Sequence, residues 1–281
     1  MRALLLLVLA ACETELDQRL AIISEPRVLA VVADPAEGKA GETIVYTALV
    51  AGPTGPILDS LAWAFCTSPK APSEDNVVSV QCVAGEALIE LGDGRTTSGA
   101  IPMDACLAFG PDTIKPGFRP RDPDPSGGYY QPVRVTVDGL LAFGLSRVSC
   151  DLANAAGDIA AAYRRGYVAN ANPVLAPLHL PAVHAGDAVT LTAAWAEPES
   201  FLYFDQLHQT LVTRREAMRI SFFATAGAMD LDAIAVGEDD PATSAATTWH
   251  APVMPGPQTL FLVLRDERGG IATQVVPVDV R

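Results

Sequence analysis

The sequence predicts an all-β fold built as two sandwiches in tandem, on three observations. Its strand-like runs are short, and many of them alternate between apolar and polar residues. Gly and Pro number 22 each and are concentrated between those runs, as turn residues are. An Asn/Pro cluster at residues 170–173 divides the 281 residues into two parts, each long enough for one domain. Apolar residues make up 49% of the chain, which excludes disorder over most of its length.

The first twelve residues are typical of an export signal. Met1 and Arg2 form a short basic start, and Ala3–Ala11 is an apolar run far below the roughly 20 residues that span a bilayer. The motif Leu9-Ala-Ala-Cys12 resembles the lipobox of bacterial lipoproteins. In that family the peptide is cut before the Cys, whose thiol receives a diacylglycerol and whose amino group is usually acylated. The alternative is an ordinary cleaved signal with Cys12 as a bystander.

The resemblance implies a signal peptide over residues 1–11 and lipidation of Cys12. It also implies a stable anchor, because several acyl chains bind a protein firmly to a bilayer, whereas a single chain binds it only marginally. The polar stretch that follows predicts a lipid-anchored tether over residues 12–25. Glu13 favours the outer membrane, because in enteric bacteria an Asp at this position often retains a lipoprotein at the inner one. We therefore expect a lipid-anchored protein of the cell envelope, in the outer membrane.

The first half, residues 26–169, contains strand-like runs separated by Gly, Pro and Asp. They lie at residues 27–33, 42–50, 61–66, 77–83, 87–91 and 133–137, and they predict an antiparallel sandwich. Two stretches interrupt the pattern. Residues 92–131 are rich in Gly, Pro and Asp without periodicity and predict one long loop, whereas the Ala-rich residues 155–165 predict a single short helix.

The cysteines after Cys12 number four, all in the first half: Cys66, Cys82, Cys106 and Cys150. An even number in an exported chain predicts two disulfides, for which three pairings are possible. We favour Cys66–Cys82 with Cys106–Cys150, because the first pair joins neighbouring strand-like runs. Zinc is disfavoured because close pairs such as C-x-x-C are absent.

The second half, residues 173–281, has strand-like runs at 188–195, 218–222 and 247–249, and the runs 258–265 and 271–280 flank a Gly-ended turn at 266–270. Thr259–Asp266, then Arg268-Gly-Gly270 and the final run resemble the last hairpin of PKD-type and related immunoglobulin-like domains. The W-D-F-G-D-G motif of PKD domains is absent, and Ser221–Gly227 stands in its place. The resemblance implies an immunoglobulin-like or PKD-type sandwich here.

The first half carries a weaker copy of the same pattern. Gly41-Glu42, followed by Trp63 and Cys66, resembles Gly186-Asp187 followed by Trp195, which implies two tandem immunoglobulin-like sandwiches. The tryptophans of both halves lie in strand-like runs, where we expect them in the cores. The whole chain also resembles Arg- and Ala-rich lipoproteins of myxobacterial type. This resemblance implies no particular activity.

Charge and motifs argue against nucleic-acid binding and catalysis. The formal net charge is −14, and without a basic cluster we expect no nucleic-acid partner. A G-x-S-x-G elbow, a P-loop and a dinucleotide fingerprint are missing, and the four histidines lack ligand spacing. We therefore predict no catalytic residues, no cofactor and no metal site, so that the protein is not an enzyme.

One stretch of the long loop has the composition of a recognition surface. The candidate ligand-binding residues are Arg119, Arg121, Asp122, Asp124, Tyr129 and Tyr130. Adjacent tyrosines in a strand point to opposite faces, so one of them is available to a sugar or a protein. Two alternatives stay open: the tyrosines pack the loop onto its sandwich, or Asp122 and Asp124 ligate calcium through an incomplete loop motif.

The functional hypothesis is a membrane-anchored cell-envelope lipoprotein that acts as a binding or scaffolding module. Its partners would be the membrane, through the N-terminal lipid, and other envelope proteins or a surface ligand. The first alternative is a surface adhesin for a carbohydrate or protein ligand, calcium-dependent or not. The second is an envelope hydrolase whose site the sequence hides.

Overall fold

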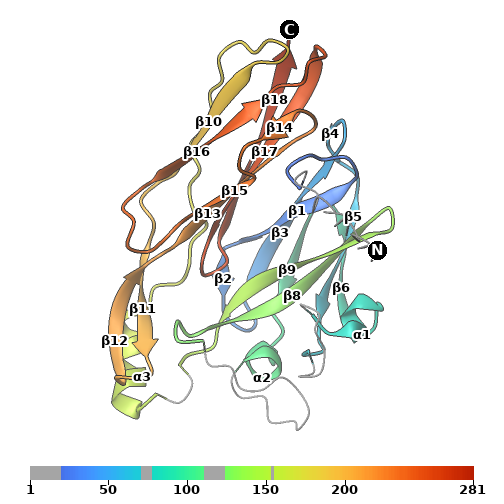
Figure 1. The fold of residues 1–281 in the computed structure, drawn as a ribbon. Helices are drawn as coiled ribbons and strands as arrows, with labels where there is room; N and C mark the ends of the chain where they lie inside the picture. Colours follow the sequence, from blue (N-terminus) through green and yellow to red (C-terminus); the bar gives the residue numbers. More distant parts are fainter. Residues whose placement is uncertain (1–19, 71–77, 111–123, 153–154) are drawn as a thin grey trace, which may run out of the picture.

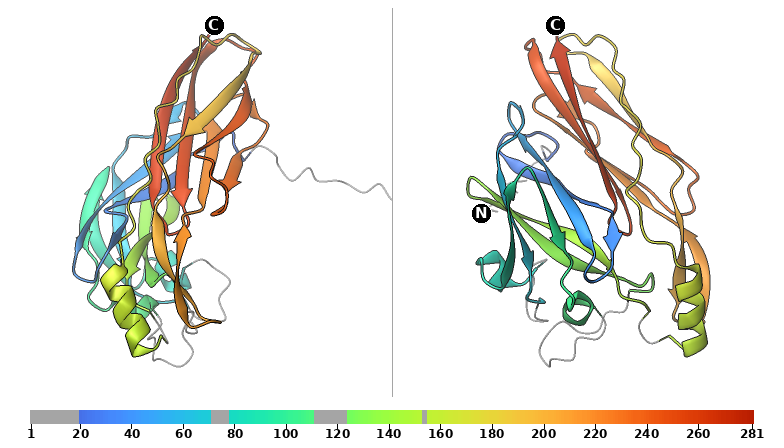
Figure 2. Two further views of the ribbon diagram at one scale, coloured as in Figure 1. Left: turned by 90° about the vertical axis from the view of Figure 1, so that its left-hand side faces the viewer. Right: turned by 180° about the vertical axis from the view of Figure 1, so that it is seen from behind.

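The computed structural model describes residues 20–70, 78–110, 124–152 and 155–281, and it confirms the all-β fold (Figure 1). Two sandwiches lie side by side in Figure 1 and in the view from behind in the right panel of Figure 2. The C-terminus is at one end of the molecule, here called the upper end, and the helices α2 and α3 are at the opposite, lower end.

The first sandwich consists of two sheets. One contains β1 (Arg27–Asp34), β3 (Thr43–Gly52), β4 (Gly55–Pro56) and β7 (Thr96–Ala100). The other has the order β2 (Glu37–Gly38), β9 (Leu140–Ser149), β8 (Gly128–Val137), β5 (Leu61–Cys66) and β6 (Leu88–Gly94). Alternate residues of β3, β5 and β8 point inward, so that Tyr46, Trp63 and Val133 form the centre of the core.

The second sandwich also consists of two sheets. One has the order β10 (Ala188–Ala194), β16 (Ser244–His250), β14 (Ala228–Met229), and the other β15 (Ala233–Val236), β13 (Met218–Ala224), β17 (Gly256–Asp266), β18 (Ile271–Val280). Trp195 and Trp249 are buried between them, as predicted, with Phe222 and Leu262. The predicted C-terminal hairpin is confirmed, because β17 and β18 pair from Gly256–Val280 to Arg265–Ile271. A separate hairpin, β11 (Ser200–Asp205) with β12 (Thr210–Arg215), extends towards the lower end.

The helices are α1 (Val80–Val83), α2 (Ala105–Phe109) and α3 (Gly157–Gly166). α3 is the predicted short helix. The strand predicted over residues 77–83 is wrong, because its described part forms α1. The Ser79 hydroxyl accepts a hydrogen bond from the amide of Gln81, which caps the helix and removes that amide from any sheet.

The prediction of one unstructured loop over residues 92–131 is also wrong in its described part. Thr96–Ala100 forms β7 on the edge of β3, α2 follows, and β8 begins at Gly128. β7 consists of Thr, Ser, Gly and Ala, and such residues give no hydrophobic periodicity. Its position comes from the open edge of β3, which is a tertiary effect.

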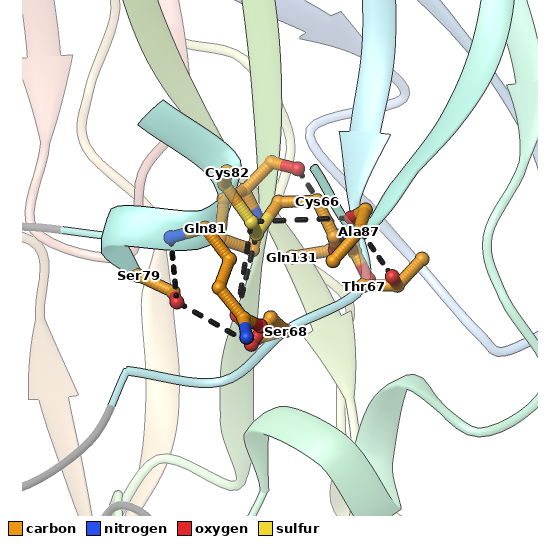
Figure 3. Close-up of a disulfide and its surroundings, with 9 residues drawn as sticks. Cys66, Thr67, Ser68, Ser79, Gln81, Cys82, Ala87 and Gln131 are labelled. Carbon is orange, nitrogen blue, oxygen red and sulfur yellow. Dashed lines mark hydrogen bonds between the residues drawn. A yellow bond between two sulfur atoms is a disulfide. The ribbon is translucent and has the colours of Figure 1, made fainter. Parts of the chain in front are cut away.

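The disulfides link Cys66 to Cys82 and Cys106 to Cys150, which is the pairing favoured from the sequence. The first joins the end of β5 to α1, where the Nε2 atom of Gln131 donates to the Cys66 carbonyl at 2.5 Å (Figure 3). Closing a loop of this length stabilises the folded state by about 3 kcal/mol in the chain-entropy model. The second holds α2 against the end of β9.

A third apolar layer lies between the two sandwiches. Leu29 and Ala30 of β1, with Ala51 of β3, pack against Phe261 and Val263 of β17. Both β17 side chains are completely buried, although they point away from their own core. The sheet of the second sandwich is therefore covered on both faces, once by its own partner sheet and once by the first sandwich.

The segment before β1 belongs to the same layer. Ile23 is buried in it, and the amide of Ile23 donates to the Ala224 carbonyl at 2.8 Å, while the amide of Ala224 donates to Ala21 at 2.9 Å. Residues 21–23 thus add a short parallel bridge to β13. The tether predicted over residues 12–25 is packed from residue 21 onward, and its earlier part lies outside the described residues.

The connection at residues 170–173 is fixed to both sides. The Asn172 side chain donates to the Ala33 carbonyl of β1 at 2.7 Å and accepts from the amide of Ile271 of β18 at 2.8 Å. One amide group therefore bridges the two sandwiches, and the connection does not act as a free linker.

We predict that the two sandwiches unfold in one cooperative transition and that Phe261→Ala separates it into two. Removing this side chain from the layer between the sandwiches costs about 3–5 kcal/mol, the usual range for Phe→Ala in a core. The check is differential scanning calorimetry. Phe222→Ala is the matched control, because Phe222 neighbours the same strand but is buried in the second core. It should lower the melting temperature and leave one transition, whereas two transitions in the wild type would contradict the account.

Candidate functional site

Buried charged residues concentrate where the lower ends of the two sandwiches meet. We call this cluster the polar junction; it consists of Glu37, Arg147, Asn170, Glu216, Asp266 and Arg268. Four of its side chains are ionisable and almost fully buried. Since a buried charge is costly unless it is paired and hydrogen-bonded, such a cluster marks a position that the fold must hold in one arrangement.

The first half of the junction is the ion pair between Arg147 of β9 and Glu37 of β2, with 3.2 Å between Nε and Oε2. The two strands are paired at this position. The remaining guanidinium nitrogens donate to the Ser126 hydroxyl at 2.9 Å and carbonyl at 3.1 Å, and to Asp124 at 3.3 Å. Arg147 is thus held from three directions.

Glu37 is equally well satisfied. Oε1 accepts hydrogen bonds from the hydroxyls of Ser149 and Tyr167, and Oε2 accepts from the amide of Asn170 at 2.8 Å. Burial by itself raises the pKa of the Glu37 carboxyl, but Arg147 and these hydrogen bonds outweigh it, so its pKa lies below the ordinary value. Glu37 therefore remains a carboxylate in the folded protein at neutral pH.

Two glycines make room for this arrangement. A Cβ on Gly128 would lie 2.0 Å from the Arg147 guanidinium carbon, and one on Gly127 would lie 1.9 Å from the Tyr163 hydroxyl. Gly127 also has a φ of +78°, which other residues rarely adopt. The sequence Gly127-Gly128 is thus a requirement of the junction.

The second half of the junction centres on Arg268, in the turn between β17 and β18. Its guanidinium pairs with Glu216 and with Glu199, donates to the Val168 carbonyl at 3.2 Å, and lies over the ring of Phe201. A desolvated cation over an aromatic face is a favourable contact. Arg268 thus ties the turn to β11 and to the segment after α3.

Asn170 connects the two halves. Its backbone amide donates to Glu37 of the first sandwich, and its side-chain amide donates to Asp266 of the second at 3.2 Å. Asp266 also accepts from the amide of Gly270 at 2.7 Å. The hydrogen bonds therefore run from one sandwich to the other through a single residue of the connection.

Glu216 is only partly hydrogen-bonded, as is the Asn170 side chain, whose Oδ1 atom is buried without a hydrogen bond. One oxygen of Glu216 pairs with Arg268, while the other is buried without a hydrogen bond. Burial, followed by the nearby Asp266 carboxylate, raises the pKa of Glu216 to about 7, and Arg268 opposes that shift. This carboxyl is therefore the titrating group of the junction near neutral pH.

The β11–β12 hairpin, which belongs to the second half of the chain, contacts the first half. The amide of Phe204 donates to the Pro125 carbonyl at 2.8 Å, and the Phe204 side chain is buried. Arg214 of β12 lies over the ring of Tyr203. This hairpin has no strong sequence signal, since its strands combine aromatic, acidic and basic residues.

The structure uses the described candidate ligand residues for internal contacts. Tyr129 is buried, and its hydroxyl accepts from the amide of Asp124 at 3.2 Å. Asp124 also accepts from the Ser126 amide and hydroxyl at 2.8 and 2.6 Å. Tyr130 is half-buried and contacts Arg147. Arg119, Arg121 and Asp122 lie outside the described residues, so a calcium site with Asp122 is not tested.

Tyr130 also lines a groove of about 470 Å³ between the sandwiches. Its lining includes Val31 of β1, Phe143 and Leu145 of β9, and Arg265 near the end of β17. Leu145 is exposed. Sequence reasoning missed this groove because its walls come from strands far apart in the chain.

The described residues contain no group of three or more His, Cys, Asp or Glu side chains that could hold a metal ion. Their four cysteines are all in disulfides. His184, His208 and His250 each contact one aspartate at the surface. Within the described ranges no helix is long and apolar enough to span a membrane.

Comparison with known proteins adds little. No protein-family model matches the chain, and no curated protein matches it either. A solved structure of the adhesin InvE of Yersinia pseudotuberculosis is 13% identical, with 89% of this chain and 58% of that one covered and a TM-score of 0.25. The alpha-2-macroglobulin of E. coli is 10% identical, with 92% and 17% covered and a TM-score of 0.26. The chain therefore spans only part of either protein, and likeness of this degree carries no functional argument.

We predict that Glu216→Gln flattens the pH dependence of stability between about pH 5 and pH 7. A carboxyl whose pKa is raised on folding holds its proton longer in the folded state, so the free energy of unfolding falls as the pH rises towards 7. The loss is on the order of 1.4 kcal/mol per unit of pKa difference. Urea unfolding of wild type and variant at several pH values measures it.

Glu197→Gln is the matched control for that series. Glu197 pairs with Arg215 on the same side of the molecule, but its side chain is exposed. This variant should keep the wild-type pH profile. If Glu216→Gln kept it as well, Glu216 would not be the titrating group of the junction.

Proposed function

We propose that this chain is a membrane-anchored cell-envelope lipoprotein that acts as a rigid binding or scaffolding module without catalysis. The polar junction is the observation that carries the proposal. It contains one buried ion pair in each sandwich, and Asn170 hydrogen-bonds to carboxylates of both, so that the two sandwiches are held at one angle, which is the property that a scaffold needs. The Leu9–Cys12 motif supports the anchor, and two disulfides suit an oxidising compartment such as the periplasm or the cell surface.

The packed segment at residues 21–23 adds to this proposal. With lipid on Cys12, only the residues from 12 to 20 separate the acyl chains from the fold, so the module would stay close to its bilayer. The outer membrane is the proposed location, on the basis of Glu13. Envelope proteins or a surface ligand are the proposed partners.

The groove favours a second candidate function. A surface adhesin for a protein or carbohydrate ligand would use its half-buried aromatic and apolar lining, since such residues dominate recognition surfaces. Tyr130 is the one residue that belongs both to the groove and to the candidates named from the sequence. Arg119, Arg121, Asp122 and Asp124 remain candidates for ligand binding, Asp124 with its carboxylate already engaged.

We predict that Cys12→Ser moves the protein from the membrane fraction to a soluble fraction or leaves it unprocessed, because the hydroxyl does not take the place of the thiol in lipidation. The measurement is fractionation with radiolabelled palmitate. Cys12→Ser that incorporates as much palmitate as wild type would refute the anchor. Glu13→Asp is the control, since it keeps the thiol and should keep the label.

We predict that Leu145→Asp abolishes capture of any partner that binds the groove, with an almost unchanged melting temperature, because this side chain is already exposed. The measurement is a pull-down from the native envelope, followed by titration of the captured partner. Leu58→Asp is the matched control, because Leu58 is exposed outside the groove. A partner that binds both variants equally would exclude the groove.

A further inference from the structure

The chain enters the fold near the upper end of the second sandwich. Residues 21–23 dock beside Ala224, which pairs with Leu260 of β17. β17 begins at Gly256, so the docking point lies about 13 Å below the upper end at roughly 3.4 Å per residue. Residues after this point are packed, and residues before it lead to Cys12.

The upper end presents two apolar side chains to solvent. Val253 and Met254 lie in the loop between β16 and β17 and are 83% and 75% exposed. The start of the loop is held by the turn before β10: the amide of Gly186 donates to the Pro252 carbonyl, and the amide of Ala251 donates to the Asp187 carbonyl. Exposed apolar residues on a fixed loop have no role in packing their own domain.

Three aspartates lie near this loop in a chain of net charge −14, and each has a contact within the protein. Asp187 contacts His184, Asp230 contacts His250, and Asp279 contacts Arg281. Because basic residues do not outnumber these carboxylates, the attraction to a bilayer at this loop is apolar and not electrostatic.

The length of chain before the docking point decides which end can meet a bilayer. The eight steps from Cys12 to Leu20 span at most about 28 Å. That exceeds the roughly 13 Å to the upper end. The tip of the β11–β12 hairpin is farther: about 20 Å of β17 and about 17 Å of hairpin lie between it and the docking point.

We propose that the loop Pro252–Pro255 is a second membrane contact, with Val253 and Met254 inserted into the interfacial region of the bilayer that holds the Cys12 lipid. The inference rests on the proposed lipid anchor. Apolar side chains gain free energy on leaving water for this region, and a second contact strengthens an anchor. The lower end, with the polar junction, then points away from the membrane.

The experiment uses the full-length lipidated protein, reconstituted in vesicles of phosphatidylethanolamine and phosphatidylglycerol. Val253→Cys carries an environment-sensitive fluorophore, and Leu207→Cys is the matched control, since Leu207 is 85% exposed at the tip of the β11–β12 hairpin. We expect a blue shift at position 253 and a loss of its emission with a quencher on the acyl chains. Position 207 should emit as in water.

Two results overturn the inference, and they are distinguishable. If the protein floats with the vesicles but position 253 emits as in water, the loop does not touch the bilayer and the lipid anchor stands. If the protein does not float with the vesicles, the anchor and the inference both fail. Met254→Cys provides a second position, so that a variant that does not fold does not decide the outcome.

Discussion

The structure depends on the burial of β17 on both of its faces. Leu260, Leu262 and Leu264 point into the second core, while Phe261 and Val263 point into the layer shared with the first sandwich. A strand of an isolated sandwich has one buried and one solvated face and would alternate. Here the run Leu260–Leu264 is continuously apolar, and all five side chains are fully buried. The first sandwich supplies the cover that this strand requires.

The polar junction follows from that packing. Once β1 lies on the sheet of the second sandwich, the ends of β2, β9 and β17 meet, and water is excluded from the charges between them. Arg147 and Glu37 satisfy each other from paired strands, and Asn170 joins them to Asp266. A buried pair adds little to stability by itself, but breaking one partner leaves an unpaired charge, so the pair specifies one arrangement.

The sequence predicted those elements whose signal is local. Strands with alternation, the Ala-rich helix α3, the C-terminal hairpin and the disulfide pairing were all accessible from it. β7 and α1 were not, because an open strand edge and a serine cap decide them. The polar junction could not be predicted either, because its contacts are long-range: Glu37 and Arg268 lie more than two hundred residues apart in the sequence. The continuous apolar run at Leu260–Leu264 indicates a strand that is buried on both faces, and it is the one local sequence signal for the layer between the sandwiches.

The two sandwiches form one rigid body in this structure. The decisive measurement is double electron–electron resonance between spin labels at position 89 of the first sandwich and position 275 of the second, because Ile89 and Val275 are exposed and lie on well-paired strands. We expect a single narrow distance distribution, unchanged between dilute buffer and molar salt. A broad or bimodal distribution would show instead that the sandwiches move about residues 170–173.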